Sequence, residues 1–155
     1  MAGASGWRYN AVSDTFWDDE KVRKWTDDGR YLALYLLTCS RRTGEGFYRL
    51  PLVNALDDLG WERGRLDAAM RELCESDFAD HDEDARLVLI VKALKHHPPI
   101  HGAASIKGAI NVLDKAKGSP RLFSRFLAAA DRYEQDFAAA IRHHYDLPEG
   151  PYQGA

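Results

Sequence analysis

The sequence predicts a mainly α-helical protein that also contains a small β-hairpin, and three observations support this prediction. Between Phe16 and Pro99, apolar residues recur at three- and four-residue steps, which is the spacing of amphipathic helices. The segment Arg86–Lys92 is instead a continuous β-branched and apolar run, typical of a strand, and a polar turn precedes it. Two short helices followed by a charged hairpin are the order of elements in a winged helix-turn-helix domain, so this is the predicted fold.

The first part of the chain is expected to hold a short strand and two helices. The strand covers 8–12, and the helix after it runs to about Trp25. Thr26 is a good N-cap for the next helix, which extends to about Cys39. That second helix is apolar on most of its sides, which predicts the central helix of the core.

The candidate helix-turn-helix follows a glycine-rich turn. The segment 47–50 is expected to be extended, and Pro51 suits the first position of a helix that ends at Gly60. The next helix, 62–76, is the candidate recognition helix. Its predicted inner face consists of Leu66, Ala69, Met70 and Leu73, and its outer face of Gly64, Ala68, Arg71 and Glu75.

A two-helix extension is expected after the double proline at 98–99. The first helix covers 104–116, and Gly118-Ser119-Pro120 provides the end of this helix and the start of the next. The final helix is expected to run from Pro120 to about Tyr145, because aromatic and aliphatic residues recur there at helical steps. The predicted organisation is a winged-helix domain over 8–100, a C-terminal helical extension over 101–147, and flexible ends at 1–7 and 148–155.

The charge distribution indicates where a nucleic acid could bind. The net charge of −3 argues against a protein that coats DNA non-specifically. The segment 101–125 nevertheless carries five basic residues against Asp114 alone, a net charge of +4. This segment is the strongest electrostatic candidate for contact with phosphates.

Several other classes of protein are disfavoured by the sequence. Cys39 and Cys74 lie on or beside apolar helical stripes, so we expect reduced, buried thiols rather than a secreted disulfide scaffold. No run of about 18 apolar residues exists, and residues 1–6 lack the features of a signal peptide, so a cytoplasmic location without membrane association is expected. No phosphate-binding loop, nucleophile elbow or zinc motif occurs. We therefore expect that the protein is not an enzyme and that it has no catalytic residues, no cofactor and no metal site.

The residues also resemble a known family. The resemblance is carried by an ordered set of segments: 16–22, 31–38, 46–51, 94–99 and 107–110, then Ser119-Pro120 with Phe126-Leu127 and Arg132-Tyr133. Together they resemble the winged-helix replication proteins of phages and prophages. These replisome organisers are similar to the N-terminal domain of DnaD-type primosome components. The resemblance implies a non-enzymatic, DNA-associated factor that helps to assemble a replication complex and often self-associates. It covers most of the chain, although the turn before the fourth helix has Trp61 in place of a serine-type cap, and the predicted wing tip is acidic.

Two groups of candidate site residues follow. The first is a set of basic residues expected to contact DNA, some on the recognition helix and some in the basic segment. A solvated surface with an Arg71–Glu75 pair is the alternative for the helix. The second group would form an interface in a homodimer, with packing inside the chain as the alternative. The predicted DNA-binding residues are Arg63, Arg65, Arg71, Lys107, Lys115, Lys117, Arg121 and Arg125, and the predicted interface residues are Phe137, Ile141 and Tyr145.

The leading functional prediction is a DNA-binding replication-initiation protein of phage or prophage type. Its expected partners are DNA and replication proteins such as a helicase or its loader. One alternative is a transcriptional regulator on the same scaffold, which would bind a promoter palindrome tightly and specifically. The other is a protein–protein adaptor that no longer binds DNA, which the acidic wing and the negative net charge favour.

Overall fold

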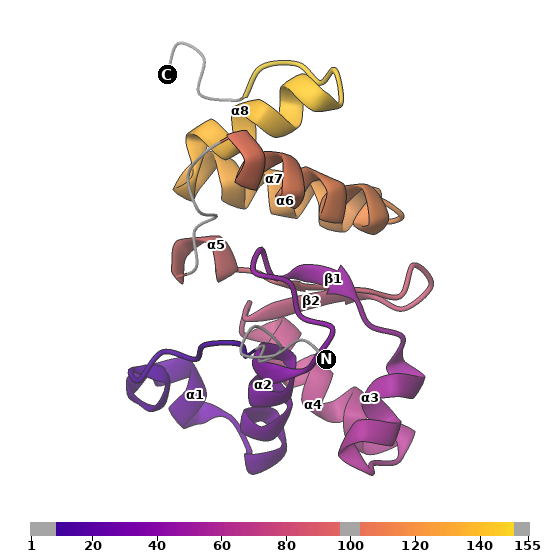
Figure 1. Cartoon of the computed structure of the whole chain (residues 1–155). Coiled ribbons are helices and arrows are strands. Elements are labelled where there is room, and N and C mark those ends of the chain that lie inside the picture. The colour runs from indigo at the N-terminus through magenta and orange to yellow at the C-terminus, as the bar shows by residue number, and fades with distance from the viewer. Residues whose placement is uncertain (1–8, 97–102, 151–155) are drawn as a thin grey trace, which may run out of the picture.

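The structure is a computed structural model in which residues 9–96 and 103–150 are described. It is mainly helical and contains one small antiparallel sheet, in agreement with the predicted mainly α class. Figure 1 shows three layers: a group of helices below the sheet, the sheet itself, and the C-terminal helices above it. The elements, in chain order, are a 3₁₀ turn at Phe16–Asp18, α1 (Glu20–Lys24), α2 (Asp27–Thr38), β1 (Phe47–Arg49), α3 (Leu52–Leu59), α4 (Arg63–Glu75), β2 (Ala79–Asp82), β3 (Leu87–Ile90), α5 (Ala93–His96), α6 (Ala103–Ala116), α7 (Pro120–Tyr133) and α8 (Gln135–His144).

Local capping signals in the sequence set several helix ends. The Thr26 hydroxyl accepts a hydrogen bond from the Gly29 backbone N–H at 3.2 Å and begins α2, as predicted. Ser119 caps α7 in the same way, and Pro120 is the first helical residue. Gly60 ends α3 with φ +67°, a left-handed conformation that glycine adopts without strain. Pro51, expected as the first helical residue of α3, lies one position earlier and serves as its N-cap.

The sheet has the strand order β1-β3-β2, with β3 in the centre. Phe47 pairs with Leu89, and His81 pairs with Val88. Alternate residues of β3 point to opposite faces: Val88 and Ile90 belong to the core below the sheet, while Leu87 and Leu89 belong to the core above it. All four are buried, which explains why this strand is a continuous apolar run rather than an alternating one.

The two cores share the sheet between them. In the lower core, side chains of α2 and α4 such as Leu36 and Leu66 pack against β3. In the upper core, Phe126 of α7 lies 5.4 Å from the ring of Phe47 in β1. The C-terminal helices therefore form a third layer on the sheet.

Three expectations about individual segments need correction, and one helix was not expected. The predicted final helix is broken at Glu134 (φ −144°, ψ 72°), so three helices follow residue 102 rather than two. The helix α2 packs into the lower core, with Leu34 and Leu37 partly buried, but it is not enclosed on all sides, since its Tyr31 is 55% exposed. No strand forms at 9–12, while α5 was not anticipated.

None of the helices described is long and apolar enough to span a membrane.

Candidate nucleic-acid interface

Helix α4 presents the face that the sequence predicted to be outward. Its inner residues are buried, while Gly64, Ala68 and Arg71 are exposed. A methyl group placed on Gly64 would meet no atom within 4 Å. The outer face is therefore an open strip of small side chains along which a large partner can approach the helix closely.

Arg65 is held by two neighbours at the start of this helix. Its Nε and Nη2 atoms donate hydrogen bonds to the two carboxylate oxygens of Asp28 in α2, both at 2.9 Å. Its guanidinium carbon lies 4.5 Å from the centre of the Trp61 ring. The hydrogen bonds from Arg65 hold the pKa of Asp28 below its usual range, so this carboxylate stays ionised at neutral pH.

Arg63 joins α4 to the turn of the β2–β3 hairpin. Its Nε donates to Asp67 one helical turn later at 2.8 Å, and its Nη2 donates to Glu83 in the hairpin turn at 2.7 Å. Both hydrogen bonds raise the pKa of Arg63. This predicted DNA contact is thus already paired with two carboxylates, although about half of its side-chain surface stays exposed.

Arg71 has no such partner. It is exposed and forms no ion pair with any residue that the structure describes, so the alternative pairing with Glu75 is not observed. The neighbouring Glu72 is turned away, because its carboxylate accepts hydrogen bonds from the Thr26 backbone N–H and hydroxyl at 2.5 and 2.7 Å. Arg71 is therefore the arginine of α4 that forms no ion pair with the described residues.

The basic segment divides into paired arginines and exposed lysines. Arg121 and Arg125 of α7 both donate to Asp80 in β2, and Arg125 also reaches Asp77 at 2.6 Å. These contacts fasten the upper layer to the sheet. The lysines are exposed, and they lie in or directly after α6, above the sheet, whereas α4 lies below it (Figure 1). They are Lys107, Lys115 and Lys117, of which Lys117 lies 6.0 Å from the Tyr145 ring.

A groove between α3, the start of α4 and the hairpin turn was not anticipated. Its volume is about 620 Å³, and Arg86 lines it together with Arg63. Arg86 is exposed and has φ +60°, a left-handed conformation that ends the turn after Glu83. The sequence predicts Arg86 only as the first residue of a strand. Its position directly after the acidic turn was the signal that could have placed it at the hairpin tip.

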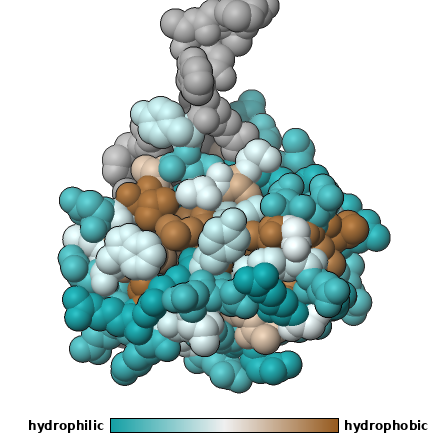
Figure 2. Space-filling model, turned by 90° about the horizontal axis from the view of Figure 1, so that it is seen from below, coloured by the Kyte–Doolittle hydropathy of each residue, from teal (hydrophilic) through white to brown (hydrophobic). Residues whose placement is uncertain are grey.

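Apolar side chains also reach the surface of the lower layer. Trp17 and Tyr31 are 56% and 55% exposed, and Val53 of α3 is 69% exposed. Figure 2 shows the lower end of the molecule, where hydrophobic residues form a band with hydrophilic residues around it. Such a surface is typical of contact with another protein rather than with phosphates.

The predicted interface residues pack inside the chain. Phe137 and Ile141 of α8 are 2% and 0% exposed in the upper core. The Tyr145 hydroxyl donates to Asp114 of α6 at 2.6 Å, and its ring contacts Phe123. The apolar surface of α8 is therefore used to hold α8 against α6 and α7.

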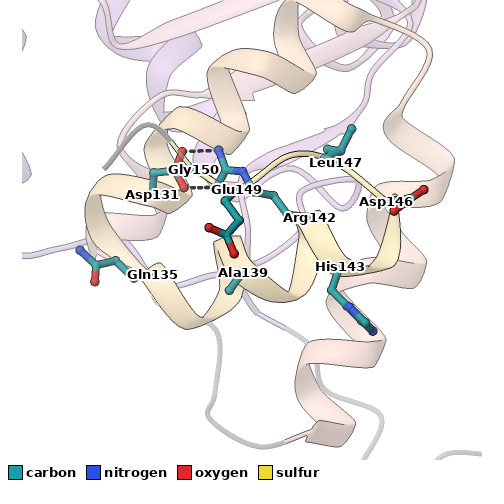
Figure 3. A pocket seen from close by; sticks show the side chains of 9 residues that line it. All are labelled: Asp131, Gln135, Ala139, Arg142, His143, Asp146, Leu147, Glu149 and Gly150. Atoms are coloured by element: carbon teal, nitrogen blue, oxygen red, sulfur yellow. Dashed lines mark hydrogen bonds and ion pairs between the residues drawn. The ribbon is translucent and has the colours of Figure 1, made fainter. Parts of the chain in front are cut away.

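A polar pocket of about 520 Å³ lies beside α7 and α8. Figure 3 shows that Arg142 and Asp131 point toward each other across it, joined by two hydrogen bonds. Both side chains are largely buried, and the segment near Gly150 covers them. The pair links α7 to α8 just beyond the break at Glu134, which indicates a structural role.

The other reactive side chains of the described residues include a cysteine beside a histidine. Cys74 lies 3.8 Å from His81, but burial raises the pKa of the thiol to about 11, so it stays protonated near neutral pH. Within 9–96 and 103–150, no three His, Cys, Asp or Glu side chains are grouped as metal ligands. His97 and His101 lie outside the described residues.

Comparison of the chain with models of known protein families, with curated proteins and with solved structures gives no match.

Proposed function

We propose that this chain is a winged-helix protein that binds duplex DNA during replication initiation, as in phages and prophages. The observation that carries the proposal is the open outer strip of α4 beside the β2–β3 hairpin. The order α2, β1, α3, α4, β2, β3 supports a winged helix-turn-helix in which α4 is the recognition helix and the hairpin is the wing. The replication role rests on the resemblance of the sequence to replisome organisers.

The arrangement of charges supports moderate binding that depends only weakly on salt concentration. Arg71 is available for a phosphate contact next to the small residues of α4. The lysines of the α6 region lie on the other side of the sheet, so a single straight duplex docked on α4 would contact mainly the arginines of α4. We therefore expect only a few phosphate contacts and a shallow dependence of affinity on salt concentration.

Fluorescence anisotropy with a labelled duplex, between about 50 and 200 mM salt, tests this proposal. The Arg71→Ala variant should weaken binding to every duplex by a similar factor and reduce the salt slope by about 1. Arg132→Ala is the matched control, because Arg132 is an exposed arginine on α7 in the upper layer. If the wild-type chain binds neither duplex nor single-stranded DNA at 50 mM salt, the DNA-binding role is wrong.

The protein–protein adaptor remains the second candidate, and a specific observation favours it. Four of the predicted DNA-contacting arginines, namely Arg63, Arg65, Arg121 and Arg125, are paired with carboxylates of the chain itself. The exposed apolar residues of the lower layer offer a surface for another protein. Absence of DNA binding together with capture of a purified helicase or helicase loader would select this function.

A further inference from the structure

Arg65 differs from the other arginines of α4 because a single carboxylate binds one edge of its guanidinium and an aromatic ring lies against the group. Asp28 binds one edge through two hydrogen bonds of 2.9 Å, and the Trp61 ring lies against the group at 4.5 Å. About half of the side chain, 53%, is still exposed. The group is therefore held in one orientation and remains accessible.

The edge of Arg65 that Asp28 leaves open has a defined chemistry. A guanidinium carries five N–H donors in a planar fork. Asp28 uses the Nε–H and one N–H of Nη2, and no residue within the described chain accepts from Nη1. The open edge thus presents parallel donors from Nη1 and Nη2, which bind two neighbouring acceptors at once.

We propose that Arg65 reads guanine in the major groove of duplex DNA and that Asp28 is the positioning residue for this contact. The inference rests on the proposed DNA-binding function. Guanine presents the acceptors O6 and N7 side by side in the major groove, which match the open edge. Adenine presents N7 beside the donor group N6–H₂, so it would place a donor against a donor.

The place of Arg65 in the helix favours a base over a phosphate. It lies in the first turn of α4, and recognition helices of this class contact base edges through their N-terminal residues. Its neighbours Gly64 and Ala68 are small and exposed, so the helix can enter the groove deeply. A phosphate contact needs no fixed orientation and suits the unpaired Arg71. A base contact gains from a side chain whose conformational entropy is already lost.

Three duplexes of about 20 base pairs test the inference in the anisotropy assay. They are alternating G·C, alternating inosine·C and alternating A·T, so that every register offers the same type of pair. Inosine keeps the O6 and N7 acceptors of guanine in the major groove but lacks the N2 amino group in the minor groove. Reading by Arg65 predicts similar affinity for the first two duplexes and about tenfold weaker binding to the A·T duplex.

Two variants test whether Arg65 and Asp28 produce the preference for G·C and inosine·C over A·T. Arg65→Ala should bring the three affinities to within about twofold of one another. Asp28→Asn should reduce the preference while leaving much of the A·T affinity, because the amide can accept from only one of the two Arg65 donors. Arg71→Ala is the control: it should weaken all three complexes and leave their ratios unchanged. Urea unfolding of each variant checks that the fold is retained.

The outcomes separate this inference from the function on which it rests. Equal wild-type binding to all three duplexes overturns guanine reading and leaves DNA binding intact. Preference for G·C over inosine·C overturns it too, since it indicates contact with N2 in the minor groove. A preference that survives in Arg65→Ala assigns the reading to another residue. Absence of binding to any duplex overturns both the inference and the proposed function.

Discussion

Asp80 is the residue through which α7 is fastened to the sheet. Burial alone would raise the pKa of this carboxyl, but hydrogen bonds from Arg125 and Arg121 outweigh burial and hold the pKa below its usual value of 3.8. The folded state therefore releases this proton at lower pH than the unfolded state does. The resulting stabilisation is fully present above the unfolded pKa and is lost as the pH falls through the folded pKa.

This linkage predicts a difference in acid sensitivity. The free energy of unfolding of the wild-type chain should fall between pH 5 and pH 2 by more than that of Asp80→Asn, which should itself be less stable at pH 7. Urea titrations at several pH values measure both trends. Parallel curves for the two proteins would show that Asp80 does not contribute.

The ion pair between Asp131 and Arg142 also makes a testable contribution to the free energy of unfolding. Asp131→Ala leaves a largely buried guanidinium without its carboxylate, so we expect a loss of about 2–3 kcal/mol in the free energy of unfolding. Asp136→Ala is the control, because this exposed aspartate in the first turn of α8 forms no ion pair within the described residues. An equal, small effect of both changes would mean that the pair does not hold α7 to α8.

The ionic partners of the arginines could not be predicted from the sequence. The charges of α4 and of the basic segment were identified correctly as exposed or partly exposed groups. Their partners come from distant elements, however: Arg65 and Asp28 are 37 positions apart, and Arg125 and Asp77 are 48 apart. The Arg63–Asp67 pair, by contrast, has the i,i+4 spacing that a sequence reveals.

At the scale of elements, two glycines have opposite roles. Gly46 precedes β1 with φ +73°, and a side chain there would collide with the Cβ of Ala93 and approach Ile90. Gly108 lies within α6, where an added methyl group would meet no atom within 4 Å. The first glycine is required by the close approach of α5 and β3, and the second only weakens its helix.

These two glycines give a matched pair of substitutions. Gly46→Ala should destabilise the protein by about 2–4 kcal/mol through backbone strain and overpacking. Gly108→Ala should stabilise it by about 0.5–1 kcal/mol because alanine is the better helix former. Thermal unfolding measures both, and a stabilising Gly46→Ala would contradict the packing of α5 against the Gly46 turn.

Helix ends that are marked by a capping residue were predicted correctly, whereas a helix end that depends on tertiary packing was not. Thr26, Ser119 and Gly60 fix helix ends through their own side chains or backbone, so the sequence was sufficient there. The break at Glu134 has no glycine or proline. It arises because α8 turns back to bury Phe137 in the upper core, a contact that only the assembled layers reveal.

At the scale of the whole molecule, both hydrophobic cores pack against the same sheet, one on each face. Its lower face packs against α2 and α4, and its upper face carries Phe47, Leu87 and Leu89 into contact with the C-terminal layer. The sequence-based boundary at 100–101 was placed at a real change in composition, at the double proline. It could not reveal that the segments on either side of this boundary bury a common strand.

This sharing predicts that damage above the sheet destabilises the part below it. Phe126→Ala should lower the stability of the whole chain by about 3–5 kcal/mol, because Phe126 is 1% exposed between Phe47 and Phe137. Trp25 and Trp61 are buried in the lower core, so tryptophan fluorescence reports on that core. The tryptophan transition in urea should shift together with the loss of helical circular dichroism. A tryptophan midpoint that does not move would show two independently folding units.

The position of β3 between two cores also bears on biosynthesis. A ribosome adds about 5–20 residues per second, so the lower layer and the strands emerge several seconds before α8 is complete. Throughout that interval Leu87, Leu89 and Phe47 have no helices above them. The nascent chain therefore exposes an apolar surface during synthesis, and the yield of folded protein will depend on how quickly α6, α7 and α8 are translated and on whether chaperones shield that surface meanwhile.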